Sequence, residues 1–128
     1  MGFERRGVVG QQEVRLLGII RFRVGEQPEA VTIQPGAEAI RREVAGFFAE
    51  IDLGDRVTAY VNDEGERLGL PYNRTVIDKD GIHRPIRGNF FLAIRTPKGT
   101  LVGFTDSQLL ATLQRVVDGT SSYFAAQP

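Results

Sequence analysis

Apolar and polar positions alternate along the first part of the chain, as they do in β-strands. Ile20 and Phe22 share one side of an extended segment, while Ile19 and Arg21 share the other, because successive strand side chains point to opposite faces. We therefore predict a strand within residues 14–24.

A turn and further strands follow this first strand. Residues 25–28 combine glycine and proline, which is typical of a turn, and residues 30–33 return to β-forming types. The two segments predict a hairpin. Three more strands are predicted later in the chain, at residues 56–61, 89–95 and 100–104, and the last two flank a turn at residues 96–99.

Two other segments have helical spacing. The apolar residues of the first are Ile40, Val44, Phe47, Phe48 and Ile51. Their spacing predicts an amphipathic helix that ends near Gly54. The second helix is expected to begin with a capping box formed by Thr105 and Gln108 and to end at Gly119. Its predicted apolar stripe consists of Leu109, Leu110, Leu113, Val116 and Val117.

These elements predict an α+β fold. It consists of a mainly antiparallel sheet of about five strands with two amphipathic helices on one face of the sheet. We expect a flexible N-terminal arm at residues 1–12, a single domain at 13–118 and a C-terminal tail at 119–128. Tyr123 and Phe124 are the tail residues expected to dock on the domain.

Composition narrows the range of functions. The 128 residues include 16 basic and 16 acidic side chains, and this zero net charge argues against a general nucleic-acid coat. The chain has no cysteine and one histidine, which excludes disulfides, zinc–thiolate sites and iron–sulfur clusters. We expect neither a metal nor a cofactor. The sequence shows neither a signal peptide nor a membrane span, so we expect a cytoplasmic protein.

A basic run at residues 83–87 is the strongest candidate for chemistry. Two arginines beside a titratable imidazole are suited to a phosphate or carboxylate, and Asn73 and Arg74 join them if the two loops approach each other. The alternative is a solvated loop whose arginines pair with Asp78 or Asp80. Both interpretations remain open at this point.

Two other patterns carry less chemistry. The segment Asp78-x-Asp80-Gly81 is similar to the start of a calcium loop, but the later ligands are missing and an ordinary turn accounts for it. Phe90 and Phe91 are adjacent, so in a strand they point to opposite faces. One of them needs a helix, a ligand or a partner subunit to cover it.

Signatures of catalysis are absent from the sequence. The serines are not part of a nucleophile motif, and Lys98-Gly99-Thr100 lacks the preceding glycines of a phosphate-binding loop. The neighbouring carboxylates of Asp63, Glu64 and Glu66 are expected to be solvated. We therefore expect a protein that is not an enzyme.

One long segment resembles a known family. The family pattern is a helix end of the type V-G-G-Y-I, then a strand, then N-E-E-G-K-x-x-G-L-P-x-N-R. The corresponding segments here are Val44-Ala-Gly-Phe-Phe-Ala-Glu-Ile, the strand at 57–61 and Asn62-Asp-Glu-Gly-Glu-Arg-Leu-Gly-Leu-Pro-Tyr-Asn-Arg74. That pattern belongs to a small uncharacterised domain family of bacteriophages and mobile elements, the domain of unknown function 3846. The resemblance covers residues 30–117, with Ala45 replacing a glycine and residues 78–87 inserted.

The resemblance implies a phage-like accessory protein but no reaction. The positions that carry over from the family pattern are Asn62, Gly65, Gly69, Pro71, Asn73 and Arg74. Their alternative role is structural, because glycine and proline shape turns and asparagine amides bond to nearby backbone.

Together these observations predict a non-enzymatic binding domain. We expect it to capture a small anionic or nucleotide ligand in counter-defence, in the host cytoplasm if a phage encodes it. The candidate ligand-binding residues are Asn62, Tyr72, Asn73, Arg74, His83, Arg84, Arg87 and Phe90. The alternative is a protein–protein module that inhibits or redirects a host enzyme through a spare sheet face around Phe90 or Phe91. The third hypothesis is a small enzyme with acid–base chemistry at His83. We expect a homo-oligomer, which is compatible with all three hypotheses.

Overall fold

A five-stranded antiparallel sheet forms the centre of the molecule. The computed structural model describes residues 6–9 and 12–126. The central strands are β3 (Leu17–Phe22), β4 (Glu29–Ile33), β5 (Phe48–Asp52), β6 (Val57–Asn62) and β9 (Phe90–Ile94). Their order across the sheet is β4–β3–β9–β6–β5, and each neighbouring pair is antiparallel. The α+β class and the five-stranded sheet are thereby confirmed.

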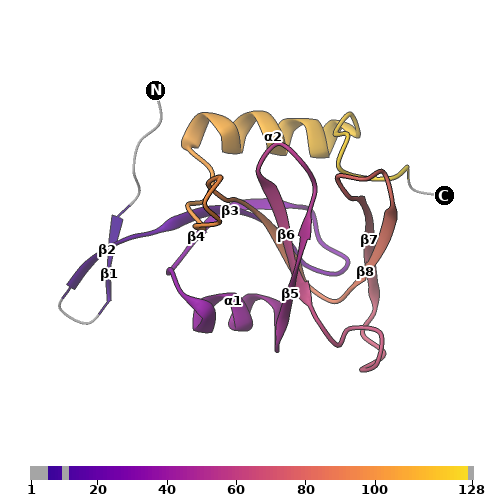
Figure 1. The fold of residues 1–128 in the computed structure, drawn as a ribbon, viewed down its shortest axis with the longest axis horizontal. Coiled ribbons are helices and arrows are strands. Elements are labelled where there is room, and N and C mark those ends of the chain that lie inside the picture. The colour runs from indigo at the N-terminus through magenta and orange to yellow at the C-terminus, as the bar shows by residue number, and fades with distance from the viewer. Residues whose placement is uncertain (1–5, 10–11, 127–128) are drawn as a thin grey trace.

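Two helices and two hairpins complete the described fold (Figure 1). The helices are α1 (Ala37–Val44) and α2 (Asp106–Asp118), and the hairpins are β1 (Arg6–Val9) with β2 (Gln12–Arg15) and β7 (Tyr72–Ile77) with β8 (His83–Arg87). The β1–β2 hairpin projects from one end of the molecule, and the β7–β8 hairpin lies at the other. Residues 6–9, expected in an arm without regular structure, are thus a strand, and the rest of that arm lies largely outside the described residues.

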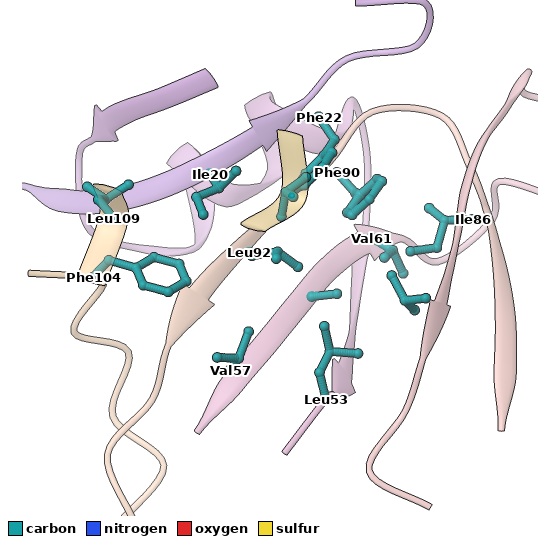
Figure 2. Packing of buried hydrophobic residues seen from close by; sticks show 13 residues of the cluster. Ile20, Phe22, Leu53, Val57, Val61, Ile86, Phe90, Leu92, Phe104 and Leu109 are labelled. Atoms are coloured by element: carbon teal, nitrogen blue, oxygen red, sulfur yellow. The ribbon is translucent and has the colours of Figure 1, made fainter. Parts of the chain in front are cut away.

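The helices pack on opposite faces of the sheet, which corrects the prediction that they share one. Ile40 of α1 packs with Ile19 and Phe91, whereas Leu109 of α2 packs with Ile20 (Figure 2). Arg21 lies on the same face of β3 as Ile19, which is the face that α1 covers. In the structure, Arg21 on that face is neutralised by Glu43 of α1, with Nε donating to Oε2 over 2.9 Å.

The first helix is shorter than its periodicity predicts. It ends at Val44, because Ala45 adopts a left-handed conformation with φ 60° and Gly46 follows with φ 156°. Residues 48–52 instead form the edge strand β5, which pairs with β6. The spacing of the apolar residues in this short segment is compatible with a helix and with a strand. The chain reversal at 45–46 decides in favour of the strand. Phe47 is left 67% exposed.

Residues 100–104 do not form the predicted strand. They make a single bridge, between Leu101 and Arg95, and then cross to β3, where the Phe104 N–H donates to the Gly18 carbonyl over 2.8 Å. The turn at 96–99 is confirmed, since Gly99 N–H donates to the Thr96 carbonyl. Because the chain crosses the sheet here, α2 lies on the face opposite α1.

The second helix follows its sequence signals closely. Thr105 and Gln108 form the reciprocal capping box, and Gly119 ends the helix with φ 72°. Its buried stripe is narrower than predicted, because Leu110 and Val117 are exposed. The chain then docks as expected, with the Phe124 ring centre 5.1 Å from that of Phe22.

The β7–β8 hairpin was not predicted from the sequence. It is closed by the predicted turn at 78–81, where Asp78 Oδ1 accepts from the N–H groups of Asp80 and Ile82, each over 2.9 Å. Asp78 Oδ2 accepts from Arg84 Nε over 3.1 Å. The Ile82 bond contributes most to lowering the pKa of Asp78 below its usual value, and the Asp80 and Arg84 bonds add to it. The carboxylate therefore holds the turn that the sequence suggested.

Asp78 should make stability depend on acidity. Its folded-state pKa lies below the unfolded value of about 3.9, so its contribution is complete above that value and is lost as the pH falls through the folded-state pKa. We expect Asp78→Asn to be less stable than wild type at pH 7 and to lose part of the acid dependence. Urea unfolding of both proteins at a series of pH values from 7 to 2 measures the free energy of unfolding and its dependence on pH. Asp80→Asn is the matched control, and equal acid dependence in wild type and Asp78→Asn would contradict the prediction.

The β5–β6 turn contains a strained pair of residues. Asp55 has φ 53° and Arg56 has φ 65°, and the Val57 N–H donates to the Gly54 carbonyl over 2.9 Å. Positive φ at both central positions is the pattern of a type I′ turn, which favours asparagine and glycine. Arginine there is disfavoured because its Cβ crowds the backbone.

Arg56→Gly should relieve this strain. We expect it to be more stable than Arg56→Ala by about 1 kcal/mol, because both remove the side chain but only glycine tolerates the positive φ. Chemical denaturation of the two variants measures the difference. A result in which Arg56→Ala is the more stable would show that the turn is not strained in solution.

Candidate functional site

A groove of about 470 Å³ lies between the β7–β8 hairpin and the turn that follows β6. Its lining residues are Ile51, Val61, Asn62, Asp63, Gly65, Glu66, Tyr72, Arg84, Pro85, Ile86 and Arg87. We call it the Arg87 groove. It unites four of the eight candidate ligand-binding residues, namely Asn62, Tyr72, Arg84 and Arg87.

A close backbone contact builds this groove. Gly65 lies in the turn, and a Cβ at that position would come within 2.8 Å of the Arg87 carbonyl oxygen. Only glycine allows the turn to approach β8 this closely. The contact brings the carboxylate-bearing turn, with Asp63 and Glu66, beside the arginine-bearing strand.

Tyr72 and Arg87 form the central pair of the groove. They are cross-strand partners in the β7–β8 register. Tyr72 is 44% exposed, and its hydroxyl lies 2.7 Å from the Thr75 hydroxyl. Arg87 Nη1 donates to the Leu70 carbonyl over 3.0 Å, and no carboxylate among the described residues forms an ion pair with Arg87. The aromatic ring of Tyr72 and the guanidinium of Arg87 therefore lie side by side at the surface.

The second arginine of the groove is partly neutralised. Arg84 donates to Asp78, as the alternative interpretation of the sequence had it, and its side chain is 51% exposed. Asp63 and Glu66 line the same groove from the turn. The groove thus has a basic wall on β8 and an acidic wall opposite.

Both asparagines have structural roles. Asn62 is buried, its Nδ2 donates to the Val44 carbonyl over 3.0 Å, and its Oδ1 accepts from the Glu64 N–H over 2.8 Å. Asn73 Nδ2 donates to the carbonyls of Phe22 and Gly88, each over 3.0 Å. These amides satisfy backbone groups, which is the structural alternative that the resemblance left open.

The other sequence candidates lie away from the groove. Phe90 is 1% exposed and stacks on Phe22 with ring centres 4.6 Å apart, so it cannot reach a surface ligand. His83 is exposed at the start of β8 and does not line the groove. Arg74 lines a different hollow, and its guanidinium lies over the Phe22 ring at 5.3 Å.

A bulge separates Tyr72 from Arg74. The β7–β8 register shifts between these two residues, with Tyr72 opposite Arg87 and Arg74 opposite Ile86. Residues two apart in a regular strand share a face, but an extra residue changes that alternation. The bulge therefore accounts for the two side chains lining different hollows. The sequence predicted solvated carboxylates at Asp63 and Glu66 and did not place them in one groove with Arg84 and Arg87.

The most strongly perturbed titratable groups lie outside the groove. Burial is the main cause that raises the pKa of Tyr60, with a hydrogen bond to Glu50 adding to it. Burial also raises the pKa of Tyr123, near Asp55. Across the described residues no three histidine, aspartate or glutamate side chains gather as metal ligands. The groove is chemically suited to binding, through donors, acceptors and one aromatic face.

The comparisons with known proteins identify the family of the chain. Within residues 6–9 and 12–126, neither helix is long and apolar enough to cross a membrane. No curated protein and no solved structure matches the chain. The family described as "Domain of unknown function (DUF3846)" matches residues 17–118, which span the central sheet, both helices and the Arg87 groove. The chain therefore belongs to this family of uncharacterised domains.

Proposed function

We propose that this chain is a non-enzymatic binding domain that captures a nucleotide in the Arg87 groove. The observation that carries the proposal is the pair formed by Arg87, without a carboxylate partner among the described residues, and the exposed ring of Tyr72. A volume of about 470 Å³ falls within the range of small-molecule sites.

Arg87 is suited to the phosphate. A guanidinium has five N–H donors in a planar fork, and the bond to Leu70 engages only one nitrogen. The backbone bond also holds the side chain in place, so less conformational entropy is lost on binding. Arg84 lines the same wall and adds positive charge that Asp78 offsets in part.

The remaining groups are suited to a nucleoside. The Tyr72 ring offers a face on which a base can stack. Asp63 and Glu66 are acceptors for ribose hydroxyls or for the amino group of a base, and their charge disfavours a phosphate on that side. The two walls would thereby orient a nucleotide with its phosphate toward β8.

The groove supports binding rather than covalent catalysis. No serine, threonine, cysteine or histidine is among the described residues that line it, so it lacks pairs of a hydroxyl or thiol nucleophile with an imidazole base, and we assign its carboxylates to binding. The family resemblance adds the proposal that the protein serves a phage or mobile element in the host cytoplasm. There it would sequester a nucleotide signal used in host defence.

The protein–protein alternative loses its main support. It relied on a spare sheet face around Phe90 or Phe91, but both side chains are fully buried in the clusters on opposite faces. Homo-oligomerisation stays a prediction that light scattering can test.

Nucleotide binding should depend on the phosphate and on Arg87. We expect AMP to bind more tightly than adenosine, because only AMP makes the charge-assisted phosphate contact. At ten times its Kd, AMP should stabilise the fold by about 1.4 kcal/mol. Arg87→Ala should weaken AMP binding by about tenfold and leave adenosine binding nearly unchanged. Calorimetric titration with AMP, GMP, CMP and UMP provides the Kd values.

Two matched pairs of variants serve as controls. Tyr72→Phe keeps the ring and should bind AMP like wild type, whereas Tyr72→Ala should bind about tenfold more weakly. Arg23→Ala removes an exposed arginine outside the groove and should have no effect. If none of the four nucleotides binds, or if AMP binds Arg87→Ala as tightly as wild type, the proposed function is wrong.

A further inference from the structure

A second hollow, of about 480 Å³, lies where the end of α2 meets the C-terminal segment. Its described lining residues are Arg74, Val116, Gly119, Ser121, Phe124, Ala125 and Ala126. We call it the Arg74 pocket. Figure 1 shows the C-terminal segment passing from the end of α2 to the β7–β8 hairpin. Apart from Arg74 and Ser121, the lining side chains are apolar or absent.

Arg74 differs from the other half-buried arginines of the described chain. Arg21 pairs with Glu43 and Arg95 pairs with Glu50. No carboxylate among the described residues pairs with Arg74, whose guanidinium instead lies 5.3 Å from the Phe22 ring centre and 5.9 Å from that of Phe124. Ring contacts of this kind use none of the five N–H donors.

The donors of Arg74 are open to solvent. Across the described residues no side-chain nitrogen or oxygen is both fully buried and without a hydrogen-bond partner. The Arg74 guanidinium makes no hydrogen bond to another described residue, so none of its nitrogens is fully buried, and the side chain lines the pocket. The two rings hold the guanidinium carbon in place, which prepares the planar fork for an external acceptor.

The surroundings explain why a cation is stable here. Gly119 lies at the C-terminal end of α2, where the helix has a partial negative charge that favours a cation. The apolar side chains of Val116 and Phe124 exclude water from part of the pocket. The lower local dielectric constant strengthens a close ion pair. The same partial negative charge repels an anion. An anion that binds here must therefore gain enough binding free energy from Arg74 and from the apolar walls to offset that repulsion.

We infer that the Arg74 pocket binds small molecules that join a carboxylate to an aliphatic body. A carboxylate matches the guanidinium fork in two parallel hydrogen bonds. The aliphatic part would pack against Val116, Phe124 and Ala125, which a bare inorganic anion cannot do. This site is separate from the Arg87 groove and does not depend on the proposed nucleotide binding.

Hexanoate and hexanol test the inference, because they share a six-carbon chain and differ in charge. Titration of the full chain, followed by backbone amide shifts in NMR, gives both Kd values. We expect hexanoate to bind at least about tenfold more tightly than hexanol. Arg74→Met, which keeps an apolar stem over the rings, should weaken hexanoate by about tenfold and leave hexanol unchanged.

Further variants separate binding from folding. Ala125→Leu fills the pocket without removing Arg74 and should weaken both hexanoate and hexanol, which provides a test even if Arg74→Met is unstable. Arg23→Met removes an exposed arginine elsewhere and should leave hexanoate binding unchanged. No shifts with hexanoate up to about 10 mM, equal affinity for hexanol, or full affinity in Arg74→Met would each overturn the inference.

Discussion

The architecture depends on a strand that is apolar on both faces. Phe90 and Phe91 are neighbours in β9, so one points to each side of the sheet. Phe90 stacks on Phe22 with ring centres 4.6 Å apart, and Phe91 stacks on Tyr60 at 5.0 Å. A sheet with this centre cannot leave either face in water, and each face requires its own covering layer.

The two covering layers differ in the number of segments that build them. On one face α1 supplies Ile40 and Val44. On the other, α2 supplies Leu109 and the β7–β8 hairpin supplies Ile86 (Figure 2), and Phe124 packs against the same cluster. Because three separate segments meet on that second face, a gap remains where α2 meets the C-terminal segment. The Arg74 pocket lies between α2 and the C-terminal segment, and the Arg87 groove lies between the hairpin and the turn after β6.

Two asparagines keep these segments in position. Asn62 joins the end of α1 to the turn after β6, and Asn73 joins β7 to the end of β3. Each amide satisfies backbone groups that would otherwise be unpaired at the junction, which costs more than a typical hydrogen bond contributes. The block from Asn62 to Arg74 therefore contributes to the Arg87 groove indirectly, because these contacts fix the positions of Tyr72 and Arg87.

Local signals in the sequence were sufficient for part of this structure. The capping box of α2, its end at Gly119, the turn at 78–81 and the opposed side chains of Phe90 and Phe91 all depend on neighbours in the chain, and each is confirmed. Tertiary contacts decided the rest. Residues 48–52 became a strand because β6 offered a pairing edge, and Arg21 is half-buried beside α1 because Glu43 neutralises it. The bulge at Asn73 placed Tyr72 and Arg74 in different hollows, since a register shift depends on the partner strand and cannot be inferred from one strand alone.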